Sequence, residues 1–323
     1  MRELQGGFLI IVLAACAWGC TALGSRGRDR SYAAMEAAGR VPAVARREAR
    51  LEEPALEESS GVAASRRNPG LFWTHNDSGD GPYLYAFDGR GQRRGVWHVT
   101  GARAEDWEDM AAGPGPEPGR AYLYVGDIGD NDRSRAYVTV YRVPEPQVVP
   151  DDARSTRRRP RATEPAEAIR FKYPDGRHNA EALLVHPSTG DIYVVVKSGE
   201  PGCGVYRLRA AQVTAGVNTL ERVGEFRSPS PLGSLVTGGA ISPDGRRVVL
   251  CDYLSAYELR LPEATPAPFE SVWRQTPAVI QVGPRRQGEA VCYRLDGLAL
   301  ALTSEGYPAM FYEVELKAVV SSQ

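Results

Sequence analysis

Cysteine is sparse in this chain of 323 residues, which contains only five. Two of them, Cys16 and Cys20, lie in the first twenty residues, which leaves Cys203, Cys251 and Cys292 for the rest of the chain. So small and odd a set excludes a disulfide-stapled scaffold. We expect Cys251 and Cys292, which sit in apolar runs, to be buried, with a disulfide between them as the alternative. Cys203 sits on an apparent turn, Pro-Gly-Cys-Gly, where we expect exposure.

Net charge is also lacking. The 39 lysines and arginines almost balance the 40 aspartates and glutamates, so the formal net charge is −1. A general nucleic-acid binder needs a clustered basic surface, and we therefore expect no nucleic-acid partner. The net charge indicates no other class of partner.

The apolar run at residues 8–15 is too short to span a bilayer as a helix. Preceded by Arg2, it has the form of a secretion signal, which we place at residues 1–20. The run ends in Leu-Ala-Ala-Cys16, which resembles the lipobox of bacterial lipoproteins; Cys20 is the alternative lipidation site, and an ordinary signal peptide is the other. The expected location is the outer side of a bacterial membrane, in the periplasm or at the cell surface, with a lipid anchor as the sole membrane contact.

Residues 21–56 contain almost no large apolar side chains over most of their length, so we expect a flexible tether. A helix over residues 31–51 is possible from composition, although no sustained apolar face supports it. The final part, residues 50–56, is the candidate for a strand that closes the domain that follows.

Five short phrases repeat along residues 57–323 at spacings of 48 to 73 residues. Each places a polar residue two positions before a second residue that is usually glutamate, and an apolar residue two positions after it. The second position is occupied by Ser60, Glu108, Glu181, Gly239 and Glu289. It is preceded two residues earlier by Glu58, Asp106, Asn179, Thr237 and Gln287, and followed two residues later by Val62, Met110, Leu183, Ile241 and Val291. Repeats of this length decide the fold.

Each phrase opens a series of short β-rich segments separated by turn residues. The pattern predicts an all-β fold, a five-bladed β-propeller of four-stranded antiparallel blades, monomeric and spanning residues 57–323. A six-bladed propeller is the alternative, but the extra length at residues 144–165 is rich in proline and arginine and is typical of an exposed loop. The arginine-rich part, residues 154–161, contacts either anionic lipid or solvent.

The repeated phrases are expected to be the innermost strands, which line the central channel. Because strand side chains alternate with period two, the polar and glutamate columns should form an acidic channel mouth above an apolar plug. We expect Asp106, Glu108, Glu181 and Glu289 to bind a divalent cation there, with Ca²⁺ favoured because it takes six to eight oxygen ligands. The alternative is a water-filled channel whose carboxylates hydrogen-bond to the protein.

Loops that follow the second strand of each unit are expected to face the same mouth. Their candidate ligand-facing residues are His75, Asn76, Asp77, Asp80, Asp130, Asn131, Lys197 and Glu305. The alternative for Asp- and Asn-rich loops is a set of turns that hydrogen-bond to their own backbone. Beside these residues, His178, Asp127 and Asp252 are candidates to activate water, since His178 directly precedes Asn179 and the aspartates sit in corresponding loops. No nucleophile elbow, P-loop, dinucleotide fingerprint or metalloprotease helix is present in the sequence.

The phrases at residues 73–79, 106–109 and 126–131 resemble those of a family of secreted bacterial β-propeller lipoproteins, distantly similar to phytase-like and SdiA-regulated propellers. The resemblance covers residues 58–316. It implies a propeller, a calcium site and, in phytase-like relatives, phosphoester hydrolysis. Those relatives surround the phosphate with several lysines and arginines, whereas the mouth loops here supply only Lys197.

The sequence therefore predicts an envelope-anchored propeller that recognises a small molecule or a protein at a calcium-binding mouth. A metal-dependent hydrolase of phosphoesters, lactones or other esters is the alternative.

Overall fold

The computed structural model describes residues 46–200, 202–230, 234–262 and 267–316. The signal segment 1–20, with Cys16 and Cys20, and most of the tether 21–56 lie outside these residues. In the described part of the chain, no helix is long and apolar enough to cross a membrane. Its helices are three short 3-10 segments, η1 (Pro150–Arg154), η2 (Ala210–Gln212) and η3 (Phe269–Arg274).

Five separate sheets confirm the all-β, five-bladed propeller and exclude the six-bladed alternative. Blade 1 contains β2 (Ser59–Ala64), β3 (Leu71–Asn76), β4 (Tyr83–Asp88) and β5 (Arg93–His98). Blade 2 contains β6 (Trp107–Pro114), β7 (Ala121–Asp127), β8 (Val138–Pro144) and β10 (Glu167–Lys172). Blade 3 contains β11 (Ala180–Val185), β12 (Ile192–Val196), β13 (Gly202–Leu208) and β15 (Glu221–Arg227). Blade 4 contains β16 (Gly238–Ile241), β17 (Arg247–Cys251), β18 (Ala256–Arg260) and β19 (Ala278–Ile280).

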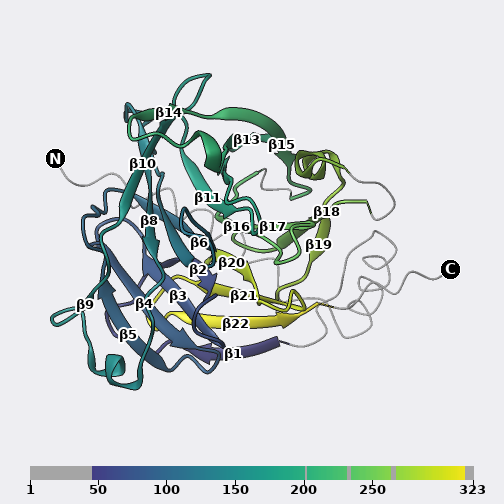
Figure 1. Ribbon diagram of the computed structural model, residues 1–323. Helices are drawn as coiled ribbons and strands as arrows, with labels where there is room; N and C mark the ends of the chain where they lie inside the picture. Colours follow the sequence, from purple (N-terminus) through teal and green to yellow (C-terminus); the bar gives the residue numbers. More distant parts are fainter. Residues whose placement is uncertain (1–45, 201, 231–233, 263–266, 317–323) are drawn as a thin grey trace, which may run out of the picture. The chain divides into compact units, whose positions relative to one another are not determined.

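Blade 5 shows how the ring closes. It contains β20 (Gly288–Tyr293), β21 (Ala299–Ser304) and β22 (Met310–Glu315), and its outer strand is β1 (Arg46–Arg50) from the other end of the chain. In Figure 1 the purple β1 runs beside the yellow β22, with Arg46 paired to Val314 and Arg50 to Met310. We expected the closing strand at residues 50–56. It lies at residues 46–50 instead. Leu51 and Leu56 are buried against blades 1 and 5, so the propeller begins before residue 57.

The first strand of every blade lies in the centre of Figure 1, as the repeated phrases predicted. β2 contacts β6 and β20, β11 contacts β6 and β16, and β16 contacts β20, so the inner strands form a closed ring. Every residue of β2, β11 and β20 is buried, because these strands pack against neighbours on both faces. The core fills the spaces between blades; Phe72 and Phe87 of blade 1, for example, pack on Phe311 of blade 5.

The insertion at residues 144–165 is not a free loop. It includes η1 and a two-residue strand, β9 (Arg161–Ala162), which extends blade 1 by pairing with β5. Arg157 forms an ion pair with Asp80 and lies over the ring of Tyr83 at 5.3 Å. The insertion therefore fastens blade 2 to the outer edge of blade 1. A similar short strand, β14 (Val217–Thr219), extends blade 2.

All three cysteines of the described residues are free and buried. This confirms the buried state of Cys251 and Cys292, which form no disulfide. The expected exposure of Cys203 was wrong, because Cys203 belongs to β13 and is only 2% exposed.

Candidate functional site

The glutamate column of the repeat coincides with β-bulges. In four inner strands the pairing register skips one residue, and the skipped residues are Ser60, Glu108, Glu181 and Glu289. A bulged residue leaves the hydrogen-bonded ladder and its side chain is re-aimed. In the fourth blade Gly239 pairs regularly with Leu250. The repeat therefore marks a local break in strand alternation, which plain period-two reasoning did not predict.

The tightest group of carboxylates lies between blades 1 and 2. Side-chain oxygens of Asp77, Asp106 and Glu108 all lie within 4.8 Å of one another. Asp77 directly follows β3, and its N–H donates to the carbonyl of Glu58 (2.9 Å). The N–H of Asp106 donates to Asp127 Oδ1 (3.0 Å). Of the four expected cation ligands, Asp106 and Glu108 belong to this group, whereas Glu181 and Glu289 do not; Asp77, which was expected as a ligand-facing loop residue, completes it.

Gly129 explains why these side chains can converge. A Cβ atom on Gly129 would collide with Glu108 Oε1 and with Asp106 Oδ2. A larger residue at position 129 would displace both carboxylates from the backbone that follows β7.

Glu181 is the carboxylate with a positive partner. Lys197 Nζ donates to Glu181 Oε1 (2.9 Å) and to the hydroxyl of Tyr253 (2.9 Å). Asn179 Nδ2 also donates to Glu181 Oε1 (3.1 Å). Burial acts to lower the pKa of Lys197, but Glu181 and Tyr253 raise it above its ordinary value, so the ammonium is retained.

Glu289 and Glu305 share one amide. Gln287 Nε2 donates to Glu289 Oε1 (2.8 Å) and to Glu305 Oε2 (2.5 Å). We call the set Asp77, Asp106, Glu108, Glu181, Glu289 and Glu305 the acidic mouth. Among the described residues, the only ion pair to any of its carboxylates comes from Lys197.

Burial and mutual repulsion raise the proton affinity of the acidic mouth. Burial, and then neighbouring carboxylates, raise the pKa of Asp77 to about 6 and that of Asp106 to about 6. The same two causes raise the pKa of Glu305 to about 7. They raise the pKa values of Glu108 and Glu289 well above the ordinary range. Without a cation, the mouth therefore holds protons near neutral pH.

Asp109 lies on β6 between Glu108 of the acidic mouth and Met110. Its Oδ1 accepts the N–H of Met110 (2.8 Å), and its Oδ2 accepts those of Leu183 (3.0 Å) and Gly239 (3.1 Å). One fully buried carboxylate thus connects inner strands of blades 2, 3 and 4. Burial raises the pKa of Asp109 well above its ordinary range, and the three N–H groups oppose that shift. A Cβ atom on Gly239 would lie 2.5 Å from Leu250 Cδ2 and 3.0 Å from the carbonyl oxygen of Val249, so glycine allows this close approach.

Several expected loop residues serve the blades instead of the mouth. His75 is fully buried and packs edge-on against Trp107, and burial lowers the pKa of its ring to about 4, so it is neutral. Asn76 accepts two backbone N–H groups at 3.1 Å and donates to Asp80 Oδ2 (2.7 Å). Asp80 is also bound by the hydroxyl of Tyr85 (3.0 Å).

The loop after β7 behaves in the same way. Asp130 accepts the N–H groups of Ser134 (2.7 Å) and Arg135 (3.1 Å), while its own N–H donates to Asn179 Oδ1 (2.7 Å). Asn131 Oδ1 accepts from Asn179 Nδ2 (3.1 Å). Through Asn179, this loop is fixed to Glu181 and so borders the mouth without adding a carboxylate to it.

The three candidate water activators do not meet. Asp127 pairs with Arg135 (2.9 Å) and supports the backbone of Asp106. Asp252 accepts the N–H of Ser255 (2.7 Å) and the hydroxyl of Tyr257 (2.6 Å). His178 lies outside the mouth, with its Nε2 3.0 Å from Asp175 Oδ1 and 3.2 Å from the hydroxyl of Tyr206.

Sequence reasoning missed Asp109 and Tyr253. Asp109 directly follows a glutamate of the repeat, and only blade 2 has an acidic residue at that position. Tyr253 directly follows Asp252, but nothing in the sequence indicates that it meets Lys197.

No protein-family model matches this sequence, and no curated protein matches it. One solved structure with a similar course of the chain is that of a gluconolactonase from Xanthomonas campestris, described as important in glucose secondary metabolic pathways. It is 12% identical, and the match covers 86% of this chain and 97% of that one with a TM-score of 0.43. The propeller assignment rests on the five sheets themselves.

Proposed function

We propose that this protein binds a divalent cation, with Ca²⁺ favoured, at Asp77, Asp106 and Glu108, and uses it to bind a ligand at the acidic mouth. The observation that carries the proposal is the convergence of three carboxylates, from two blades, within 4.8 Å. Among the described residues none of the three forms an ion pair, and burial, followed by neighbouring carboxylates, raises their pKa values.

The donor set fits a hard cation. Calcium–oxygen distances are about 2.3–2.6 Å, so two oxygens bound to one ion are at most about 5 Å apart. The observed separations satisfy that limit. All three donors are carboxylate oxygens, and this favours Ca²⁺ or Mg²⁺ over metals that prefer nitrogen or sulfur. Three side chains also provide fewer than the six to eight oxygens that Ca²⁺ takes, which leaves positions for ligand oxygens.

The rest of the mouth supports recognition of an oxygen-rich ligand. Lys197 and Tyr253 place an ammonium and a hydroxyl beside the carboxylates, 2.9 Å from each other. With a secretion signal and lipidation at Cys16 or Cys20, such a propeller acts as a monomeric recognition module on the outer side of the bacterial membrane. Its ligand is a small molecule or a protein.

A metal-dependent hydrolase of lactones, other esters or phosphoesters is the second candidate. The observation that favours it is that Glu305, whose pKa burial and neighbouring carboxylates raise to about 7, lies in the same mouth as Lys197 and is not one of the three proposed cation ligands. A carboxylate of that pKa accepts a proton from water near neutral pH, and an ammonium stabilises a developing oxyanion. His178, Asp127 and Asp252 are held elsewhere and have no part in this proposal.

Metal analysis of the purified protein, followed by calorimetric titration with Ca²⁺ and with Mg²⁺ after chelation, tests the cation site. We expect one bound ion, and we expect Glu108→Gln to weaken Ca²⁺ binding by at least about a hundredfold, since even indirect partners of metal ligands contribute 10- to 100-fold. Glu200→Gln, at an exposed position, is the matched control and should change nothing. Equal effects of the two variants, or no binding, would refute the site.

A panel of lactone, carboxylic ester and phosphoester substrates separates the enzyme from the recognition module. Turnover by the wild type that Glu108→Gln abolishes supports the hydrolase. Turnover no greater than that of the variant supports recognition alone.

A further inference from the structure

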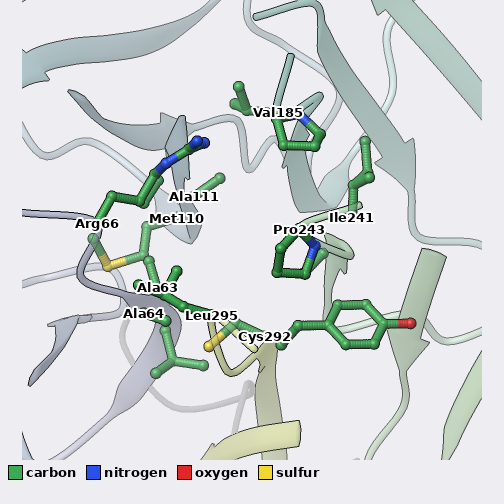
Figure 2. Close-up of a pocket in the computed structure, with 15 residues that line it drawn as sticks. Ala63, Ala64, Arg66, Met110, Ala111, Val185, Ile241, Pro243, Cys292 and Leu295 are labelled. Atoms are coloured by element: carbon green, nitrogen blue, oxygen red, sulfur yellow. The ribbon is translucent and has the colours of Figure 1, made fainter. Parts of the chain in front are cut away.

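The opposite end of the central channel contains an apolar cavity of about 260 Å³. All five inner strands contribute to its wall, together with the turns that follow four of them. The residues that line it are Val62, Ala63, Ala64, Arg66, Met110, Ala111, Ala112, Val185, Pro187, Ala240, Ile241, Pro243, Cys292, Tyr293 and Leu295. In Figure 2, Arg66 and Met110 lie on one side of this space, and Ile241 and Pro243 lie on the other.

Small side chains create the cavity. Five of its lining residues are alanines. Ala111, Ala112 and Ala240 sit within inner strands yet are only half-buried, because the cavity opens onto them. Protein interiors are normally packed without such spaces, so this one is a candidate site for a small ligand.

The cavity and the acidic mouth have no residue in common, and three residues of the expected apolar plug, Val62, Met110 and Ile241, line the cavity. Between Glu108 and Met110 on β6, Asp109 connects three blades through its three backbone hydrogen bonds. Entry is from the other face, where the turns carrying Arg66, Pro187 and Leu295 form the rim and Leu295 is 44% exposed. The site is therefore independent of the cation proposed above.

Arg66 is the only charged residue among those that line the cavity. It is exposed, its backbone N–H donates to Glu145 Oε2 (3.1 Å), and among the described residues its guanidinium forms no ion pair. Its neighbour Arg67, in contrast, donates to the carbonyl of Glu145 (3.0 Å) and to Gln147 Oε1 (3.1 Å). A single free guanidinium at the edge of an apolar space is complementary to an amphiphile with one negative charge.

We propose that this cavity binds a medium-chain alkyl carboxylate, with the chain between the inner strands and the carboxylate at Arg66. At about 30 Å³ for each carbon, close to the volume of a water molecule, the cavity accommodates about nine carbons. The two acyl chains of a membrane lipid exceed this volume.

A series of n-alkanoates from hexanoate to dodecanoate, titrated calorimetrically, measures the cavity directly. Affinity should rise by about fourfold for each added methylene and stop rising near nine or ten carbons. The series should give the same values in chelator and with Glu108→Gln. No binding, or a rise that continues through dodecanoate as in nonspecific surface adsorption, would overturn the proposal.

The headgroup is tested by comparing octanoate with 1-octanol. Arg66→Ala should weaken octanoate binding by about tenfold, as loss of a charged hydrogen bond does, and leave 1-octanol unchanged. Arg67→Ala removes the same charge next to the site and should affect neither ligand. Equal loss with both variants would contradict the assigned role of Arg66.

Cavity filling tests the position of the chain. Ala111→Leu and Ala240→Leu, each confirmed as folded by circular dichroism, should abolish octanoate binding. If one variant fails to fold, the other still decides. Unchanged binding in a folded variant would show that the ligand lies elsewhere.

Discussion

The two ends of the central channel are built from the same five strands but have opposite chemistry. At one end, six carboxylates meet one ammonium, and burial raises the pKa of most of them. At the other end, fifteen lining residues include one charged side chain. On β6 the change occurs over three consecutive residues, from Glu108 of the acidic mouth through Asp109 to Met110 of the cavity wall. A charged site and an apolar site can thus be built on the same inner strands, with a fully buried and hydrogen-bonded carboxylate at the transition on β6.

The largest effect is expected from removing the carboxylate of Asp109. Asp109→Ala leaves three buried N–H groups unsatisfied, each costing about 1–3 kcal/mol, so we expect a loss of about 3 kcal/mol or more in the free energy of unfolding. Urea denaturation measures it. Asp296→Ala, in an exposed turn, is the control, and a similar small change in both variants would contradict the role of Asp109.

Asp109 also shows where sequence reasoning ends. The inner strands, the polar mouth and the apolar end were predictable because composition repeats five times along the chain. The bonds of Asp109 were not, since Leu183 and Gly239 are 74 and 130 positions away. The bulges depend likewise on pairing between strands. Asp127, Asp130 and Asp252 illustrate a different difficulty, because turns that bind their own backbone have the same composition as ligand-binding loops.

The pH dependence of the acidic mouth is the next largest expected effect. The folded, cation-free protein holds protons on Asp77 and Asp106 up to about pH 6 and on Glu305 up to about pH 7. The unfolded chain releases them near pH 4, so stability without a cation falls as the pH rises from about 4 to 7. Affinity for Ca²⁺ should rise over the upper part of that range, by up to about tenfold per pH unit for each proton displaced. Calorimetry at pH 5.5, 6.5 and 7.5 checks this, and a constant affinity would argue against these ligands.

Lys197 provides a smaller change of charge at the same end. Lys197→Met removes the ammonium that is bound to Glu181, so the affinity for Ca²⁺ should rise, by about fivefold at the separations of a mouth this size. Lys172→Met, on the exposed part of β10, is the matched control. Weaker Ca²⁺ binding in the Lys197 variant would show that Glu181 needs this partner to keep the mouth in place.

The smallest expected effect concerns the apolar end. Ala240→Leu should change the affinity for Ca²⁺ by less than about twofold, because the residue lies below Asp109 and carries no charge. Calorimetry of the folded variant measures it. A larger change would mean that the two ends of the channel are coupled.

Thermal melting of chelator-treated protein with and without Ca²⁺ tests the central claim most directly, when the wild type is compared with Asp106→Asn. Ca²⁺ should raise the melting temperature of the wild type in a concentration-dependent manner and leave that of the variant unchanged, because an ion that binds only the folded state stabilises it. The same melting temperature for the wild type with Ca²⁺ and with chelator would contradict the cation site.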